Sequence, residues 1–395
     1  MILGAVVGFL VCVVLTIVFD LIDFIWKGFL EGETPWWYPL PLCLLGGLLV
    51  GLWNKHFKTE AILLGEVIAE VKKAGSFTWT PFFPNLVSFI LPITFGGAIG
   101  PLAGLSGLIA TGCTWVSKAL RRIYSTITGQ KNRPTDDKTN QEKSRTQGEE
   151  DALPDSNPND APQTTPFFSK KPKRIMYCLG IAGGIFGCWL VFALGGGIEL
   201  PYFGPFAWSL ENIAWIIPFI AAGYLLILAY KASLVLWEKV AKKLGDNLLA
   251  KTLLCGLVLG VVAIAFPFAL FPGSEQSTDL KTLWPMFSGA TLIAMGFTKA
   301  FVIACCMNLG WKGGPFFPII LAGMCIGFGG ALLLGVDPLL STCITATAAV
   351  AAFSRKPLMS IVFILVLYSL WDLPWIAATA FIAARLPLPK FALGR

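Results

Sequence analysis

The stretch that decides the fold is Leu309–Gly330, LGWKGGPFFPIILAGMCIGFGG, in which two glycines and a proline come just before a long apolar run. Proline suits the first position of a helix, and glycine lets the backbone turn tightly just before it. The stretch Ile93–Gly112, ITFGGAIGPLAGLSGLIATG, has the same arrangement at Gly100 and Pro101. Both stretches therefore predict an apolar helix that begins abruptly after a glycine-rich segment.

The 395-residue chain as a whole is poor in charge, with 55% hydrophobic and 13% charged residues. An ordinary soluble domain has about 25% charged residues. Of the 53 charged side chains, 17 fall between Lys131 and Arg174, so the rest of the chain is poorer still. Apolar surface of this extent needs lipid as its solvent. The composition therefore argues against a soluble enzyme, a nucleic-acid-binding protein and a disulfide scaffold.

Uncharged windows predict where the chain crosses the membrane, because a spanning helix needs about 17 to 25 apolar residues. The window Ala74–Ser117 is too long for one span and contains four prolines, so it should hold two or three segments, some not fully crossing. Pro357–Trp371 and Leu373–Ala384 are short and predict tilted or partial helices. The other windows are Met1–Phe19, Trp36–Asn54, Ile175–Ile198, Asn212–Tyr230, Thr252–Ser274, Thr282–Thr298, Gly313–Val336 and Pro338–Ser354. We predict an all-α integral membrane protein with about ten to fourteen full, tilted and re-entrant helices.

Residues 131–172 form a polar, proline-rich segment that predicts a disordered loop. This loop divides the membrane domain into a first part, 1–130, and a remainder, 173–395. Excess Lys and Arg beside membrane segments marks the cytoplasmic side, which places the loop and the C-terminus in the cytoplasm of a multi-pass cell-membrane protein. The net charge of +7 then reflects orientation and gives no reason to expect a nucleic-acid partner.

The two glycine-rich segments also predict a site. A helix that starts partway through the membrane presents free N–H groups and a partial positive charge at its tip. Two such tips, at Gly97–Pro101 and Gly314–Phe317, would bind an anion without a basic side chain. Kinked helices that merely pack closely have the same sequence features, and the spacing alone leaves both interpretations open.

The order of these motifs resembles that of the CLC family of chloride channels and chloride/proton antiporters. Gly313–Pro318 is similar to the Gly-Gly-x-Phe-x-Pro element with which a helix of that family begins, and Lys299 stands where members often have a lysine. Lys251–Gly273 resembles the family's helix with a Phe-Pro ending, and Ser354–Tyr368 resembles its Arg-Ala-Pro-Leu segment. The likeness runs from about residue 35 to 385 without the polar loop. It implies two inverted halves, joined near residues 212–250, and a homodimer with one pore per subunit.

Three departures from the family pattern bear on function. Ile99 occupies the position of the glutamate that gates the pore and carries protons in antiporters, and isoleucine cannot titrate. The family's Gly-Ser-Gly-Ile-Pro is not visible in Lys58–Val71, where Thr59 could supply a hydroxyl. By ungapped count from Arg355, Trp371 falls at the late tyrosine that donates to chloride. An indole N–H is also a donor, although Trp371 could equally be an aromatic of the membrane interface.

The resemblance thus implies a divergent prokaryotic-type member without the gating glutamate or cytoplasmic regulatory domains, neither an enzyme nor dependent on a cofactor. We expect passive, channel-like passage of small inorganic anions, chloride by default. The alternatives are a proton-coupled anion antiporter or fluoride exporter, and a non-conducting membrane scaffold. Lys299, in an apolar window, would either attract anions or pair structurally. The expected anion-binding residues are Gly97, Ala98, Ile99, Gly100, Pro101, Gly314, Pro315, Phe316, Phe317 and Trp371.

Overall fold

The computed structural model of the chain describes residues 2–28, 35–59, 67, 70, 81–101, 104–115, 119, 172–194, 200–311 and 313–389. The predicted polar loop lies outside these residues except for Pro172, with which a helix begins. Most of the stretch Lys58–Val71 also lies outside them.

Every regular element in the described residues is helical. The long elements are α1 (Ile2–Asp23), α2 (Pro39–Phe57), α4 (Phe82–Thr94), α7 (Pro172–Ala193), α9 (Ile216–Lys243), α10 (Leu248–Ala265), α12 (Gly289–Asn308), α13 (Phe316–Leu334), α14 (Pro338–Ser354) and α16 (Leu373–Arg385). The shorter ones are η1 (Phe24–Gly28), α8 (Leu210–Ala214), η2 (Pro267–Ala269), α11 (Ser274–Leu283), η3 (Trp284–Met286), α15 (Pro357–Leu365) and η4 (Leu370–Asp372). Residues 104–115 are also helical.

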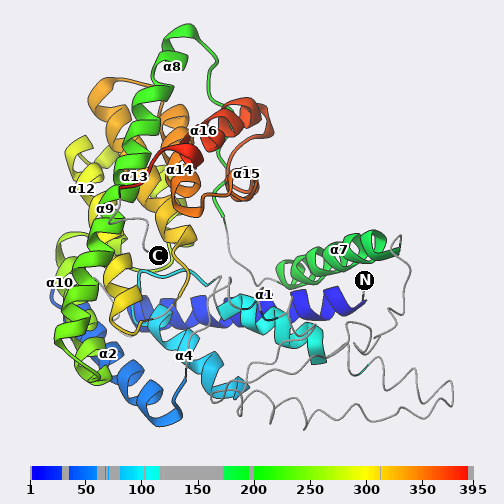
Figure 1. Cartoon of the computed structure of the whole chain (residues 1–395), viewed down its shortest axis with the longest axis vertical. Helices are drawn as coiled ribbons and strands as arrows, with labels where there is room; N and C mark the ends of the chain where they lie inside the picture. The colour runs from blue at the N-terminus through cyan, green and yellow to red at the C-terminus, as the bar shows by residue number, and fades with distance from the viewer. Residues whose placement is uncertain are drawn as a thin grey trace, which may run out of the picture.

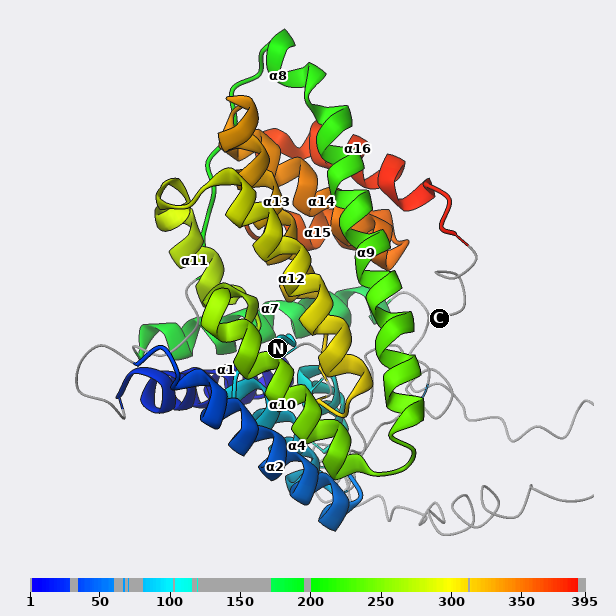
Figure 2. The same cartoon turned by 90° about the vertical axis from the view of Figure 1, so that its left-hand side faces the viewer.

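The helices form two groups (Figure 1). α1 and α7 lie side by side at one end of the molecule with α2 and α4. α12, α13, α14 and α16 pack together at the other end with the long helix α9, whereas α10 lies along α2 and touches α12. Figure 2 shows α9, α12 and α13 crossing the body of the molecule next to one another.

The predicted membrane segments are confirmed as helices. Among the described residues, six helices are long and apolar enough to cross a bilayer, and α14 coincides with the window Pro338–Ser354. The long window Ala74–Ser117 contains α4 and the helix 104–115, separated by an irregular segment. α15 and α16 have 9 and 13 residues and are too short to span upright. The all-α membrane fold expected from the sequence is therefore what the structure has.

Helix starts follow the capping residues rather than the edges of the uncharged windows. The window Thr282–Thr298 suggests a helix that ends before Lys299, but α12 begins at Gly289 and continues to Asn308. Its start is fixed by Ser288, whose hydroxyl accepts the N–H of Thr291 at 3.1 Å. The helix continues through Lys299 because this buried ammonium has protein partners and does not need water.

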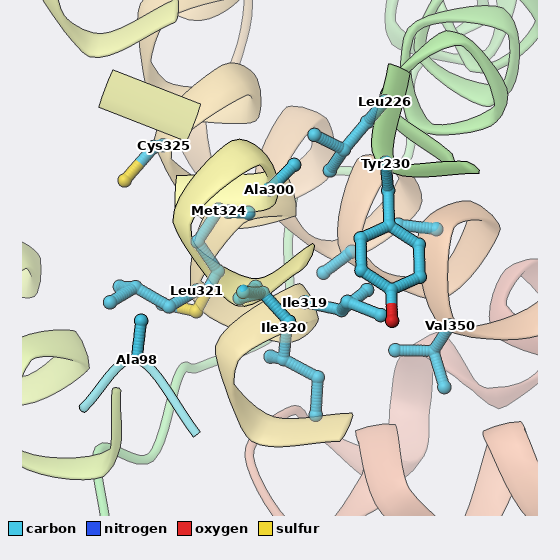
Figure 3. Packing of buried hydrophobic residues seen from close by; sticks show 14 of the residues in the cluster. Ala98, Leu226, Tyr230, Ala300, Ile319, Ile320, Leu321, Met324, Cys325 and Val350 are labelled. Atoms are coloured by element: carbon cyan, nitrogen blue, oxygen red, sulfur yellow. The ribbon is translucent and has the colours of Figure 1, made fainter. Parts of the chain in front are cut away.

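Close approach of glycines holds neighbouring helices together. A Cβ on Gly256 of α10 would lie 2.3 Å from the Cys43 carbonyl oxygen of α2, and one on Gly327 of α13 would lie 2.5 Å from the Thr342 Cα of α14. Membrane helices associate by such backbone contacts, because the lipid is as apolar as the side chains. The same packing buries almost all of α13, and Figure 3 shows Ile319, Ile320 and Leu321 of this helix among the buried residues.

Candidate functional site

The first glycine-rich segment follows α4 and turns sharply. Gly96 has a φ of +90°, which glycine adopts without strain, and the N–H of Gly97 donates to the Pro92 carbonyl at 2.8 Å. Residues 98–101 are then non-helical and buried, before the helix 104–115. Figure 3 shows Ala98 of this segment close to Leu321 and the other buried side chains of α13.

The second glycine-rich segment connects α12 to α13. Gly310 has a φ of +88°, and the N–H of Trp311 turns back to the Cys306 carbonyl at 3.1 Å. The buried Trp311 indole anchors this turn by donating to the Thr252 carbonyl of α10 at 3.1 Å. α13 begins at Phe316, directly after Pro315, as the sequence predicts.

The structure brings these two segments together as a reciprocal backbone pair. The N–H of Gly100 donates to the Gly314 carbonyl at 2.5 Å, and the N–H of Gly314 donates to the Gly100 carbonyl at 2.8 Å. The two glycines form an isolated antiparallel bridge. Residues far apart in the sequence thus place two Gly-Pro helix starts side by side.

Only very small residues allow this pairing. A Cβ on Gly100 would lie 3.0 Å from the Gly314 carbonyl oxygen and 3.2 Å from the Pro318 Cδ atom. A Cβ on Gly313 would lie 2.6 Å from the Ile99 Cβ atom, which is closer than real Cβ contacts come. Ile99 is completely buried, so its side chain packs directly against the backbone of the second segment.

The pairing determines which backbone amides remain for a ligand. Gly97, Gly100 and Gly314 donate within the protein. The N–H groups of Ala98, Ile99, Phe316 and Phe317 have no acceptor among the described residues. An unpaired N–H in a buried site is costly unless a ligand or water accepts it, and those of Phe316 and Phe317 carry the positive end of the α13 dipole. The arrangement can therefore bind an anion through neutral donors.

Trp371 is placed differently from the other expected site residues. Its side chain is 76% exposed, whereas Ile99 and its neighbours are buried. The turn after α15 explains its orientation, because the Ser369 hydroxyl accepts the Trp371 N–H and starts η4. The buried aromatic of this turn is Tyr368, whose ring stacks on Phe203 with centroids 4.9 Å apart.

A buried carboxylate that the sequence analysis did not single out lies one residue further on. Asp372 is the N-cap residue of α16, but its side chain caps no backbone N–H and is completely buried. Neither carboxylate oxygen of Asp372 has a hydrogen-bond partner among the described residues, and burial raises the pKa of this carboxyl above its ordinary value. In the sequence, Asp372 is marked only as the single charged residue between the two short windows Pro357–Trp371 and Leu373–Ala384.

Thr59, the possible replacement for the missing serine, already has a partner. Its hydroxyl donates to the Asn54 side-chain oxygen at 2.7 Å. The Ser88 hydroxyl donates to the same oxygen at 2.5 Å. These three side chains connect the end of α2 to α4, which is a structural role.

Comparisons with known proteins give one family. A family model described as voltage gated chloride channel matches residues 173–387, more than half of the chain, and includes the second glycine-rich segment and Lys299. A search of curated proteins finds no match.

Solved structures agree on the fold over nearly the whole chain. The chain is 14% identical to a CLC-type fluoride/proton antiporter, and the match covers 97% of this chain and 94% of that one with a TM-score of 0.61. The chain is 17% identical to a slow cyanobacterial Cl⁻/H⁺ antiporter, and the match covers 97% of this chain and 92% of that one with a TM-score of 0.60. At these identities the likeness shows the shared fold alone.

Proposed function

This chain belongs to the voltage-gated chloride channel family, and on that premise we propose that it lets small inorganic anions, chloride by default, pass passively across a membrane. Members of this family transport anions and are not enzymes. The chain is a multi-pass integral membrane protein with their fold. The proposal concerns the ion, the mechanism and the residues.

The observation that carries the proposal is the reciprocal pairing of Gly100 with Gly314. It supports an anion site made by Gly97, Ala98, Ile99, Gly100 and Pro101 from one segment and Gly314, Pro315, Phe316 and Phe317 from the other. Conduction requires binding that is strong enough for entry and weak enough for exit. Neutral N–H donors meet this requirement, because they attract an anion without a full opposite charge.

Passive passage follows from the side chain at position 99. Coupling to protons needs a group that alternately holds a proton and gives way to the anion. Ile99 has no ionisable atom and is fixed by its contact with Gly313. Anion movement through the site should therefore follow the anion's own electrochemical gradient.

Flux from proteoliposomes tests the function. Vesicles loaded with chloride should release it when valinomycin and a potassium gradient set the membrane potential, and protein-free vesicles should not. With no potential and no chloride gradient, an imposed pH gradient should move no net chloride. Uphill chloride movement under that condition would identify a proton-coupled antiporter, and no release at all would identify a non-conducting scaffold.

Bromide tests the site independently of flux. In crystals soaked with bromide, the anomalous density should lie within about 3.0–3.5 Å of the Ile99 and Phe316 nitrogens, which is hydrogen-bonding range for a large anion. These amides lie at the two helix starts and have no acceptor among the described residues. Clear bromide density elsewhere, with none at this position, would remove the site assignment and leave the fold unaffected.

We further propose a homodimer in the cell membrane, with the loop 131–172 and the C-terminus in the cytoplasm. The family resemblance and the basic flanks of the loop support this arrangement. α15 offers a face for the partner copy, since Leu358, Val362 and Val366 follow one another at helical spacing and are 70%, 66% and 51% exposed. The mass of the detergent-solubilised protein, corrected for bound detergent, should equal two chains; a single-chain mass would exclude the dimer.

A further inference from the structure

Lys299 is a completely buried lysine, and its hydrogen bonds define what it can do. The side chain is completely buried on α12. Its ammonium donates to the carbonyls of Phe268 at 3.2 Å, Leu270 at 2.5 Å and Phe271 at 2.8 Å. A lysine ammonium has three N–H donors, and all three are used. Lys299 therefore does not bind an anion directly, and of the two roles left open by the sequence the structure favours pairing with the protein.

The three carbonyls belong to one irregular segment, Phe266–Gly273, between α10 and α11. The segment contains the short turn η2 and two prolines. Phe271 has a φ of +62°, in the left-handed region that residues other than glycine avoid. Carbonyls that leave a helix at membrane depth need a partner other than lipid. Lys299 supplies this partner for three of them.

The same segment contacts the first glycine-rich segment on one side. The N–H of Phe271 donates to the Gly96 carbonyl at 3.3 Å. A Cβ on Gly96 would lie 2.7 Å from Leu270 Cδ2, so the Leu270 side chain packs against this turn. Phe271 also meets Trp26 edge-on with centroids 4.8 Å apart, and the Trp26 indole donates to the Thr94 carbonyl just before Gly96 at 2.9 Å.

On its other side the segment contacts the start of α13. A Cβ on Gly273 would lie 3.1 Å from the Leu321 Cβ atom and 3.4 Å from the Phe317 carbonyl oxygen. The backbone held by Lys299 thus touches both elements that supply the unpaired amides. This contact supports the two segments in addition to the Gly100–Gly314 pair.

We propose that Lys299 is a positioning residue of the anion site. By holding the carbonyls of Phe268, Leu270 and Phe271, it fixes the segment Phe266–Gly273 and, through it, the separation of Gly96 and the first turn of α13. The spacing of the amides at Ile99 and Phe316 sets how tightly an anion binds and which anion fits. This inference rests on the proposed function and extends it to a residue that makes no contact with the ion.

The test compares Lys299→Met, which keeps the length of the side chain but loses the donors, with Lys299→Arg, which keeps donors and charge. Lys281→Met is the matched control, because Lys281 also donates to a carbonyl, that of Tyr202 at 2.6 Å, but at an exposed position. In proteoliposomes the chloride concentration for half-maximal flux should rise by about 3- to 30-fold in Lys299→Met, the range found for residues that act on a site through others. The chloride-to-bromide preference should change as well. In Lys299→Arg the half-maximal chloride concentration and the halide preference should both return most of the way to the wild-type values. Lys281→Met should have the wild-type values.

A second variant keeps the proposal testable if Lys299→Met does not fold. Leu270→Ala leaves the ammonium, its charge and the Leu270 carbonyl in place and truncates the buried side chain that packs against Gly96. It should shift the half-maximal chloride concentration and the halide preference in the same direction as Lys299→Met. If the wild type conducts and either variant has the wild-type half-maximal chloride concentration and halide preference, Lys299 does not position the site. If the wild type does not conduct, the proposed function is wrong, but the role of Lys299 can still be tested. The occupancy of bromide in crystals of each variant then replaces the flux measurement.

Discussion

Replacing Ile99 by glutamate is expected to make anion flux depend on pH. The new carboxylate would stand beside the unpaired amides and, when ionised, compete with the anion for them. Burial raises the pKa of such a carboxyl towards neutrality. Flux should therefore be low where the carboxyl is ionised and rise as the pH falls through its pKa, by up to about tenfold for each pH unit, because the ratio of ionised to neutral form changes by that factor.

Ile99→Gln is the matched control for this substitution. Glutamine has nearly the same shape as glutamate but cannot ionise, so its flux should be as independent of pH as that of the wild type. Any loss of flux common to both variants measures the effect of a polar side chain against Gly313. A pH profile in Ile99→Glu that coincides with that of Ile99→Gln would show that position 99 does not face the anion.

Replacing Gly313 by alanine is expected to abolish most of the flux. The new methyl group would lie 2.6 Å from the Ile99 Cβ atom, and Ile99 is completely buried and cannot turn away. Overpacking at such a contact costs about 1–3 kcal/mol, which is enough to separate the paired segments and lower flux by about tenfold or more. The measurement is chloride release per folded protein in proteoliposomes.

A second substitution should reverse this loss. In the double variant Ile99→Gly with Gly313→Ala the methyl group occupies the space that the Ile99 side chain leaves, so the two segments can pair again. Gly204→Ala is the control for an added methyl group alone, because nothing lies within 4 Å of that position. If the double variant is as inactive as Gly313→Ala, the contact between residues 99 and 313 is not the cause.

Local sequence determines the helices and the two helix starts well. Proline after glycine marks the beginning of α13 at Phe316, and an uncharged window coincides with α14, because both features act within a few residues. The register of the pairing could not be derived in this way. Several glycines flank each proline, and only the tertiary structure selects Gly100 and Gly314.

The features that the sequence left open or did not reveal depend on partners that it does not name. Lys299 interrupts an apolar window, but its partners are backbone carbonyls, which every residue has. Asp372 looks like the boundary between two short helices, and only burial reveals it as an interior carboxyl. Counting from Arg355 to Trp371 ignores the turn after α15, which directs Tyr368 inward and Trp371 outward.

The pairing of Gly100 with Gly314 also sets the order of events during biogenesis. The two residues are 214 positions apart. At about 5–20 residues per second, a ribosome needs roughly 10–40 s to synthesise the chain between them. During that interval the first segment has no second segment to pair with. The pairing is therefore completed late in translation, and a nascent chain that stops before Gly314 lacks one of the two paired segments.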